Sequence, residues 1–291
     1  MHQSLALCAS GDERTSAAVV DFIVIGAMRA GTTMLNDLLA QHPEIAMARM
    51  KETDFFIDTK NYRLGTDWYG SQFAPGARLR GEVSPNYSKA RDFPDVPRRI
   101  HGHCPAVRLV YMLRDPVERA LSHYAHGWSM GRITLLPDQL IGGPQYEGMV
   151  DASRYARQLA QYHRHFPAEQ ILILDFESFR ADPQPHYDAL LRHIGAAPMP
   201  VPSARRQNES SELARVPKPL LKLAQGPLRP VLTRVFNPAV RGQLRRLMAR
   251  GPARTPPEFT QKLRDHLCDD LTEDAATLRA MTGQAFPDWS V

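Results

Sequence analysis

The chain has 291 residues, of which 43% are hydrophobic, and its formal net charge is +5. This length suits one large α/β domain or two small ones, and the hydrophobic content is ordinary for a globular core, so disordered and fibrous proteins are excluded. The apolar runs are too short for a transmembrane helix, and residues 1–16 lack the apolar core of a secretory signal. We therefore expect a cytoplasmic protein without a membrane span. The three cysteines predict free thiols and no metal site, because they lie far apart in the sequence; they are Cys8, Cys104 and Cys268.

The positive charge is concentrated in one segment. Residues 213–257 contain ten Lys or Arg and no Asp or Glu, so this segment carries +10 and the remainder −5. Such a segment is typical of proteins that bind an anionic cofactor, acceptor, membrane or nucleic acid, and equally of a solvated helical face. Seven prolines also fall within residues 196–230. We expect residues 196–256 to form a Pro-rich, basic covering segment or lid. Residues 1–18 are expected to be a flexible tail before a single domain at 19–291.

The predicted elements begin with a strand, a glycine turn and a helix. Residues 22–25 form an uninterrupted apolar run, typical of a buried parallel strand, and apolar residues recur at helical spacing over residues 34–39. Gly26 and Gly31 bound the turn between them. These parts together form a phosphate cradle, because the N–H groups of the first helical turn are free and the helix dipole adds partial positive charge. An ordinary turn without a ligand is the alternative.

The same turn can be compared with the P-loop of nucleotide triphosphatases. The spacing of Gly26 and Gly31 matches the first part of that motif, which next requires Lys and then Ser or Thr. This chain has Thr32 and Thr33 there, and its cation is Arg29, inside the loop. As the P-loop of a kinase or nucleotide hydrolase, this turn would therefore lack the main phosphate-binding lysine. It remains the rival interpretation, supported also by Asp175 at the end of a predicted strand.

Strands and helices are predicted to alternate along the rest of the chain. We expect strands at residues 45–48, 79–83, 107–113 and 171–174, and helices at 94–101, from Pro116 onward, at 153–165, 183–194, 257–267 and 275–281. Residues 135–149, rich in Gly and Pro, predict an irregular loop. This alternation predicts an α/β fold with a P-loop-like parallel sheet of about five strands and helices on both faces. Ligands gather at the carboxyl ends of such strands, so Arg114 should share an edge with Arg29.

A short charged segment precedes two aromatic residues. Lys51 and Glu52 lie just before Phe55 and Phe56. A carboxylate beside a cation and an apolar surface is suited to act as a general base, because these neighbours adjust its pKa. Burial against the apolar surface raises the pKa, and the cation lowers it. The alternative is a surface turn anchored by two buried phenylalanines.

Three motifs occur together in a specific order: Gly26 to Thr33, Lys51-Glu52 before Phe55-Phe56, and Leu113 to Pro116 followed by Ser122. With these motifs the sequence resembles the sulfotransferases that use 3′-phosphoadenosine 5′-phosphosulfate (PAPS). It is most similar to the branch that contains the heparan sulfate sulfotransferases and their bacterial relatives. The resemblance covers about residues 20–195.

The resemblance implies a function and a set of site residues. Such an enzyme moves a sulfuryl group from PAPS to a hydroxyl or amine of a carbohydrate, glycolipid or other small molecule, and releases adenosine 3′,5′-bisphosphate without a metal. The residues implied to hold the 5′-phosphosulfate are Arg29, Ala30, Gly31, Thr32 and Thr33. Arg114 and Ser122 are implied to hold the 3′-phosphate. Glu52 falls at the position of the general base, and Arg29 would stabilise the leaving phosphate oxygen.

The chain also departs from the family pattern. Arg29 lies where the family commonly has Lys, and Val83 replaces the Lys of a Glu-Lys-Ser/Thr-Pro motif, so that Lys51 is the candidate catalytic lysine. Arg254 is the candidate for a late loop against the 3′-phosphate. The expected partner is a small-molecule or glycan acceptor. A module that binds nucleic acid or another anion through residues 213–257 is the non-enzymatic alternative. The sequence predicts neither the acceptor nor the oligomeric state.

Overall fold

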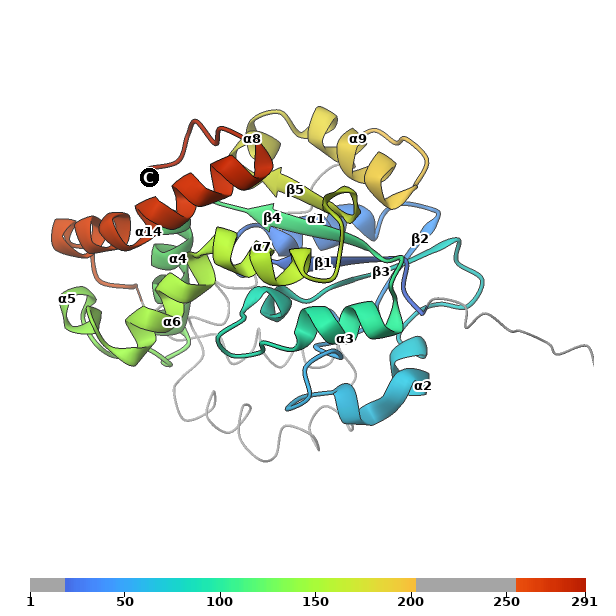
Figure 1. The fold of residues 1–291 in the computed structure, drawn as a ribbon, viewed down its shortest axis with the longest axis horizontal. Coiled ribbons are helices and arrows are strands. Elements are labelled where there is room, and N and C mark those ends of the chain that lie inside the picture. The colour runs from blue at the N-terminus through green and yellow to red at the C-terminus, as the bar shows by residue number, and fades with distance from the viewer. Residues whose placement is uncertain (1–18, 203–254) are drawn as a thin grey trace, which may run out of the picture.

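The computed structural model describes residues 19–202 and 255–291, and a five-stranded parallel sheet forms its centre (Figure 1). The strands are β1 (Phe22–Gly26), β2 (Ile45–Met47), β3 (Leu79–Val83), β4 (Arg108–Leu113) and β5 (Ile171–Asp175). Their order in the sheet is β2-β3-β1-β4-β5, and all neighbouring strands are parallel. The predicted α/β fold, with a parallel sheet of about five strands, is confirmed.

Strand β1 lies at the centre of the sheet because its side chains are apolar on both faces. All five of its residues are buried, with β3 paired on one side and β4 on the other. Phe22 lies opposite Gly81 of β3, and a Cβ on Gly81 would lie 2.0 Å from the Phe22 ring. The glycine therefore makes room for the aromatic side chain that opens the central strand.

Helices cover both faces of this sheet. They are α1 (Thr32–Leu39), α2 (Gly65–Gly70), α3 (Val96–His103), α4 (Pro116–Ser129), α5 (Pro137–Leu140), α6 (Pro144–Ser153), α7 (Tyr155–His163), α8 (Phe176–Ala181), α9 (Pro183–Ile194) and α14 (Gln261–Thr282). Short 3₁₀ turns, η1, η2 and η3, occupy Tyr62–Leu64, Pro85–Ser88 and Ala168–Gln170. Helix α1 contacts β2 and β3, and α9 contacts β4 and β5. Figure 1 shows α3 and α7 in front of the sheet and α1 behind it.

A second cluster of buried apolar residues joins α4, α6 and α14. It includes Leu121 of α4, Met149 of α6 and Leu267 of α14. This packing fixes the position of α4, the helix that begins at the carboxyl end of β4 and carries Ser122.

The two closing helices expected from the sequence are one continuous helix, α14, so that prediction was wrong. The buried stripe of α14 runs through Leu263, Leu267, Leu271, Ala275 and Leu278 without a break. The polar residues between Leu267 and Ala275 lie mainly on the solvent side of the helix. They therefore continue an amphipathic helix and do not interrupt it.

The prediction of an irregular loop at residues 135–149 was also wrong, since α5 and most of α6 occupy this segment. Pro137 and Pro144 are the first residues of these helices. Proline is favourable there because its fixed φ suits a helix and the N–H it lacks would be unpaired anyway. Helix α7 begins at Tyr155, two residues later than expected, and α2 and α8 were not predicted.

Two predicted segments lie outside the described residues: the tail at residues 1–18, and most of the covering segment at 196–256 together with Arg254. Within residues 19–202 and 255–291, no helix combines the length and the apolar character that crossing a membrane requires.

Candidate active site

A cavity of about 910 Å³ lies at the edge of the sheet where the carboxyl ends of the parallel strands meet. Residues from the segment after each strand line it: Arg29 after β1, Glu52 after β2, Asn86 after β3, Arg114 after β4 and Phe176 after β5. The prediction that Arg114 shares an edge with Arg29 is confirmed. The cavity therefore gathers residues that are far apart in the sequence.

The turn between β1 and α1 has the geometry of an anion-binding cradle. The first hydrogen bond of α1 runs from the Leu35 N–H to the Gly31 carbonyl, at 3.1 Å, so the N–H groups of Thr32 and Thr33 are not used within the helix. Arg29 and Gly31 both have left-handed backbones, with φ of 74° and 84°. A Cβ on Gly31 would lie 2.5 Å from the Phe176 ring, which explains the need for glycine there.

The five residues predicted for this cradle do not play the same part. Arg29, Gly31, Thr32 and Thr33 line the cavity. Ala30 is fully buried, and its N–H donates to the Ala27 carbonyl at 3.1 Å. Ala30 therefore shapes the turn, whereas the other four face the space where a ligand would bind.

Arg114 and Ser122 lie beside the cradle. Ser122 Oγ accepts a hydrogen bond from Arg29 Nε at 3.2 Å. The Arg114 guanidinium lies over the Phe176 ring, 5.7 Å from its centroid, and its Nε lies 3.5 Å from Glu177 Oε1. That separation is long for a hydrogen bond, and Arg114 Nε has no hydrogen-bond partner among the described residues. Its donors are therefore incompletely used.

Glu118 in the first turn of α4 does not neutralise Arg114, because it pairs with a residue of α14. Glu118 Oε1 accepts from Arg264 of α14 at 2.8 Å, whereas its other oxygen is 3.9 Å from Arg114. Glu118 therefore forms its hydrogen-bonded ion pair with Arg264 and only a long contact with Arg114. Burial and the charge of Arg114 both lower the pKa of Arg29, which shows that the two guanidinium groups repel each other across the cavity.

Lys51 and Glu52 lie on the loop after β2. The Lys51 ammonium donates to Thr33 Oγ1 at 2.6 Å and lies 3.4 Å from Glu52 Oε1, so it joins this loop to the cradle. The Glu52 side chain is 44% exposed, and its N–H donates to the Val83 carbonyl at 3.0 Å. Glu52 and Asp54 both have left-handed backbones. Such strained residues cluster at functional sites.

The two phenylalanines of this segment point into the core. Phe55 stacks on Tyr69 with ring centroids 4.3 Å apart, and Phe56 meets Tyr87 edge to face at 5.8 Å. Both phenylalanines are buried, as the alternative of an anchored turn predicts. The Glu52 side chain stays 44% exposed, so these two rings do not enclose its carboxylate.

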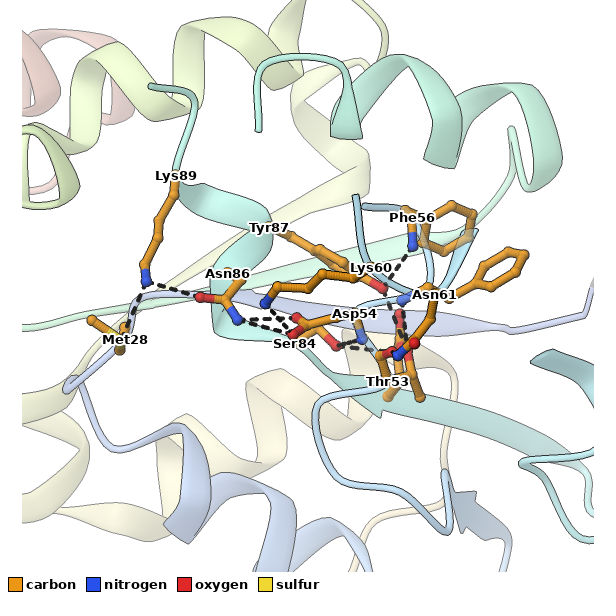
Figure 2. A network of polar contacts seen from close by, with 12 residues as sticks. Met28, Thr53, Asp54, Phe56, Lys60, Asn61, Ser84, Asn86, Tyr87 and Lys89 are labelled. Carbon is orange, nitrogen blue, oxygen red and sulfur yellow. Dashed lines mark hydrogen bonds and ion pairs between the residues drawn. The ribbon is translucent and has the colours of Figure 1, made fainter. Parts of the chain in front are cut away.

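The fully buried carboxylate near the loop is Glu82, at the end of β3. Burial raises its pKa to about 7, although hydrogen bonds from Thr53 and Tyr87 act in the opposite direction. The Thr53 hydroxyl donates to the Glu82 carboxylate. Nearby, the Tyr87 hydroxyl accepts from the Phe56 N–H at 3.2 Å, and Asn61 Nδ2 donates to the Thr53 carbonyl at 2.6 Å (Figure 2). This network positions the loop that carries Glu52.

A second set of polar contacts runs from this loop to the cradle (Figure 2). Asp54 pairs with Lys60 at 2.5 Å and accepts from Asn86 Nδ2 at 3.1 Å. Asn86 Oδ1 accepts from the Lys89 ammonium at 2.8 Å, and that ammonium lies 3.4 Å from the sulfur of Met28. Met28 directly precedes Arg29, so the loop that carries Glu52 and the cradle are connected through the segment after β3.

Helix α4 contributes three further residues that sequence reasoning missed. Arg119 is fully buried and donates to the carbonyls of Met28 and Met149, at 3.3 and 2.6 Å, and to a serine hydroxyl of α6. His123 and His126 line the cavity, and burial together with nearby cations lowers their pKa values to about 2 and about 4. Both are therefore neutral at pH 7. Arg119, Ser122, His123 and His126 follow the spacing i, i+3, i+4, i+7, which places all four on one side of the helix, and this signal could have found them.

Asp175, which supported the rival P-loop interpretation, is engaged in structural contacts. Its side chain caps α8 by accepting from the Ser178 N–H at 2.9 Å, and it also accepts from Trp289 Nε1 at 2.9 Å. The carboxylate therefore holds together a helix start and the C-terminal segment. Within the part of the chain that the structure describes, no group of three or more His, Cys, Asp and Glu side chains is gathered as a metal site would require.

Comparison with known proteins gives a consistent assignment. A family model described as "Sulfotransferase domain" matches residues 20–208. Bifunctional heparan sulfate N-deacetylase/N-sulfotransferase 3 of Homo sapiens is 28% identical over 206 residues, which are 64% of this chain and 23% of that protein. Heparan sulfate glucosamine 3-O-sulfotransferase 5 of Mus musculus is 26% identical over 189 residues, 60% of this chain and 53% of that protein. The chain thus spans less than two thirds of the length of these curated relatives.

One solved structure shows the same fold. The crystal structure of a sulfotransferase from Alicyclobacillus acidocaldarius aligns with a TM-score of 0.65 at 22% identity, and the alignment covers 94% of this chain and 99% of that one. The family model also spans more than half of the sequence, and its match includes the cradle, the loop that carries Glu52, and Arg114. The chain therefore belongs to the sulfotransferase domain family.

Proposed function

We propose that this chain is a PAPS-dependent sulfotransferase that acts on a hydroxyl or amine of a carbohydrate, glycolipid or other small-molecule acceptor. One observation carries the proposal: a single cavity brings together the cradle residues Arg29 and Thr33, a second cationic group at Arg114 and the exposed carboxylate of Glu52. This is the set of groups that transfer from a doubly phosphorylated donor to a neutral acceptor requires. The heparan sulfate enzymes among the relatives make a glycan acceptor a reasonable candidate.

The donor side of the cavity fits PAPS, which carries its sulfuryl group on a 5′-phosphate and a second phosphate at the 3′ position. In the proposal, the free N–H groups of Thr32 and Thr33 bind the 5′-phosphate, because they lie at the positive end of α1. Arg114, whose Nε has no hydrogen-bond partner among the described residues, binds the 3′-phosphate together with Ser122. The hydrogen bond from Arg29 to Ser122 supports this proposal, because it joins a residue proposed for the 5′-phosphate to one proposed for the 3′-phosphate.

The acceptor side of the cavity supplies the base. Glu52 takes the proton from the acceptor as the new bond to sulfur forms and the bond between sulfur and the phosphate oxygen breaks. Arg29 stabilises the charge that develops on this oxygen, and Lys51, which contacts both Thr33 and Glu52, supplies a second cation. A sulfuryl group carries less negative charge than a phosphoryl group. N–H donors and side-chain cations can therefore suffice for this transfer without Mg²⁺.

The donor assignment is tested by calorimetry with two nucleotides. Adenosine 3′,5′-bisphosphate should bind much more tightly than AMP, which lacks the 3′-phosphate. The Arg114→Ala variant should lose most of that preference, since a charge-assisted hydrogen bond contributes about 1.5–3 kcal/mol, or roughly 10- to 150-fold in affinity. Equal affinity of the wild-type protein for the two nucleotides would contradict the assignment.

The role of Glu52 is tested with the isosteric Glu52→Gln variant, which keeps the size of the side chain and loses its basicity. Turnover of PAPS with a suitable acceptor should fall by about 10²- to 10⁴-fold, with little change in nucleotide affinity. Glu44→Gln is a matched control, because Glu44 lies at the other end of β2, outside the cavity, where it pairs with Arg78. Wild-type turnover in Glu52→Gln, with chemistry rate-limiting, would rule out this base. Joint loss of nucleotide binding would instead indicate that Glu52 holds the loop in shape.

A further inference from the structure

Lys89 is a cavity residue that none of the sequence motifs includes. It follows η2 at the carboxyl end of β3, and its ammonium reaches toward the cradle (Figure 2). Nζ donates to Asn86 Oδ1 at 2.8 Å and lies 3.4 Å from the sulfur of Met28. Both partners are uncharged. Lys89 therefore brings a cation to the place where the loop that carries Glu52 and the cradle are connected.

The other two lysines of the cavity differ from Lys89 in their partners. Lys51 lies 3.4 Å from Glu52, and Lys60 pairs with Asp54 at 2.5 Å. Among the described residues, Lys89 has no carboxylate within ion-pairing distance. An ammonium group has three N–H donors, of which Asn86 takes one and the Met28 sulfur is at most a weak acceptor. At least one strong donor is left for a ligand.

None of the described charged groups around Lys89 forms an ion pair with it. Arg119 of α4 and Lys60 disfavour its positive charge, whereas Asp92 and Asp54 favour it but lie beyond ion-pairing distance. Burial and Arg119 together lower the pKa of Lys89 to about 8. A cation that is largely buried without an ion-pair partner is unfavourable until an anion compensates it.

His123 gives independent support for an incomplete site at this position. It lines the cavity, and its Nδ1 is buried without a hydrogen-bond partner among the described residues. Arg119 and Lys89 are the nearby charges that contribute most, after burial, to the low pKa of this imidazole. Buried polar atoms are almost always paired, so an unpaired one beside an uncompensated cation indicates where a polar ligand group binds.

We propose that Lys89, with His123 beside it, is an anion-binding subsite of the cavity. The Lys89 ammonium binds an anionic oxygen group that arrives with one of the reactants: the sulfuryl end of the donor, or an acid group on the acceptor. Lys89 contacts Met28, next to the cradle, and it is linked through Asn86 to Asp54, on the loop that carries Glu52. The donor and the acceptor are both proposed to bind close to these residues. This inference rests on the proposed function.

Four forms of the full chain test the subsite: the wild type, Lys89→Met, Lys89→Arg and Lys262→Met. Lys262 is an exposed residue of α14 and controls for the loss of one positive charge. In the donor arm, calorimetry compares PAPS with adenosine 3′,5′-bisphosphate, which lacks the sulfuryl group. If the sulfuryl end is the ligand, Lys89→Met should lose about 10-fold or more in affinity for PAPS and little for the bisphosphate. Lys89→Arg and Lys262→Met should stay near the wild type.

In the acceptor arm, p-nitrophenyl β-D-glucuronide and p-nitrophenyl β-D-glucoside are titrated into protein saturated with the bisphosphate. These probes differ only at C6, where the glucuronide has a carboxylate and the glucoside a hydroxymethyl group. If an acid group of the acceptor is the ligand, the wild type should prefer the glucuronide by about 10-fold or more, and Lys89→Met should lose this preference. Wild-type behaviour of Lys89→Met in both arms would overturn the inference.

Proton uptake provides a readout that a purely structural role would not change. An amine with a pKa of about 8 is partly neutral at pH 8.5, so binding of an anion should draw a proton onto it. Calorimetry at pH 8.5 in two buffers of different ionisation enthalpy measures this uptake, which should vanish in Lys89→Met and in Lys89→Arg. Uptake that persists in Lys89→Met would contradict the inference. Failure of the wild type to bind either nucleotide would instead contradict the proposed function.

Discussion

Replacing Gly31 by alanine should disturb both phosphate-binding groups of the cavity through one aromatic ring. A Cβ on Gly31 would lie 2.5 Å from two carbons of the Phe176 ring, closer than van der Waals contact permits. Arg114 lies over the same ring, 5.7 Å from its centroid. The added methyl group must therefore push the ring away from beneath the guanidinium that we assign to the 3′-phosphate.

Two costs add up in the Gly31→Ala variant. Gly31 has φ 84° and ψ 9°, and a left-handed backbone costs alanine roughly 1–2 kcal/mol. Crowding a packed side chain adds about 1–3 kcal/mol. The free energy of unfolding should therefore fall by roughly 2–5 kcal/mol. Gly195 is a matched control, because it has φ 76° and ψ 23° and a Cβ added there would meet no described atom within 4 Å, so Gly195→Ala should show the backbone cost alone.

Urea unfolding of both variants measures this difference, and calorimetry measures the effect on binding. Because the displaced ring supports Arg114, Gly31→Ala should weaken the binding of adenosine 3′,5′-bisphosphate about 10-fold more than that of AMP. Equal destabilisation of the two variants would show that Phe176 moves aside freely. Equal loss of affinity for both nucleotides would show that this ring does not position Arg114.

Three further predictions follow from the buried and strand-end residues. The native protein should lose roughly 3 kcal/mol of stability as the pH rises from the ordinary pKa of Glu82, 4.5, through its raised value of about 7, because only the folded state holds the proton there. Urea unfolding at pH 5 and pH 8 should show that Glu82→Gln removes this dependence. The Asp175→Ala variant should lose about 1–3 kcal/mol of stability, measured in the same way, because a helix cap and the Trp289 contact are lost. It should nevertheless keep sulfuryl transfer, whereas a P-loop kinase would lose a metal ligand. Sulfuryl transfer should also survive EDTA, and strict dependence on Mg²⁺ with consumption of ATP would favour the kinase.

Local patterns in the sequence were sufficient to predict the strands of the sheet and the order of the motifs. Strand β3 and helix α9 have the predicted bounds, residues 79–83 and 183–194. Strands buried on both faces appear as continuous apolar runs, and Pro183 and Gly195 mark the ends of α9 by their backbone preferences. Such signals act within a few residues of one another, so one sequence reveals them without knowledge of the fold.

The neighbours of each site residue depended on the tertiary structure. Arg29 meets Ser122 across 93 positions of sequence, and Met28 meets Lys89 across 61. These contacts follow from the strand order β3-β1-β4, which brings the segments after three separate strands together at one edge. Burial likewise decides that Glu82 of β3 has a raised pKa, while the side chain of Glu52 on the neighbouring loop stays exposed. Distances and solvent exposure are properties of the packed molecule, because they arise from contacts between distant residues and leave no local pattern in the chain.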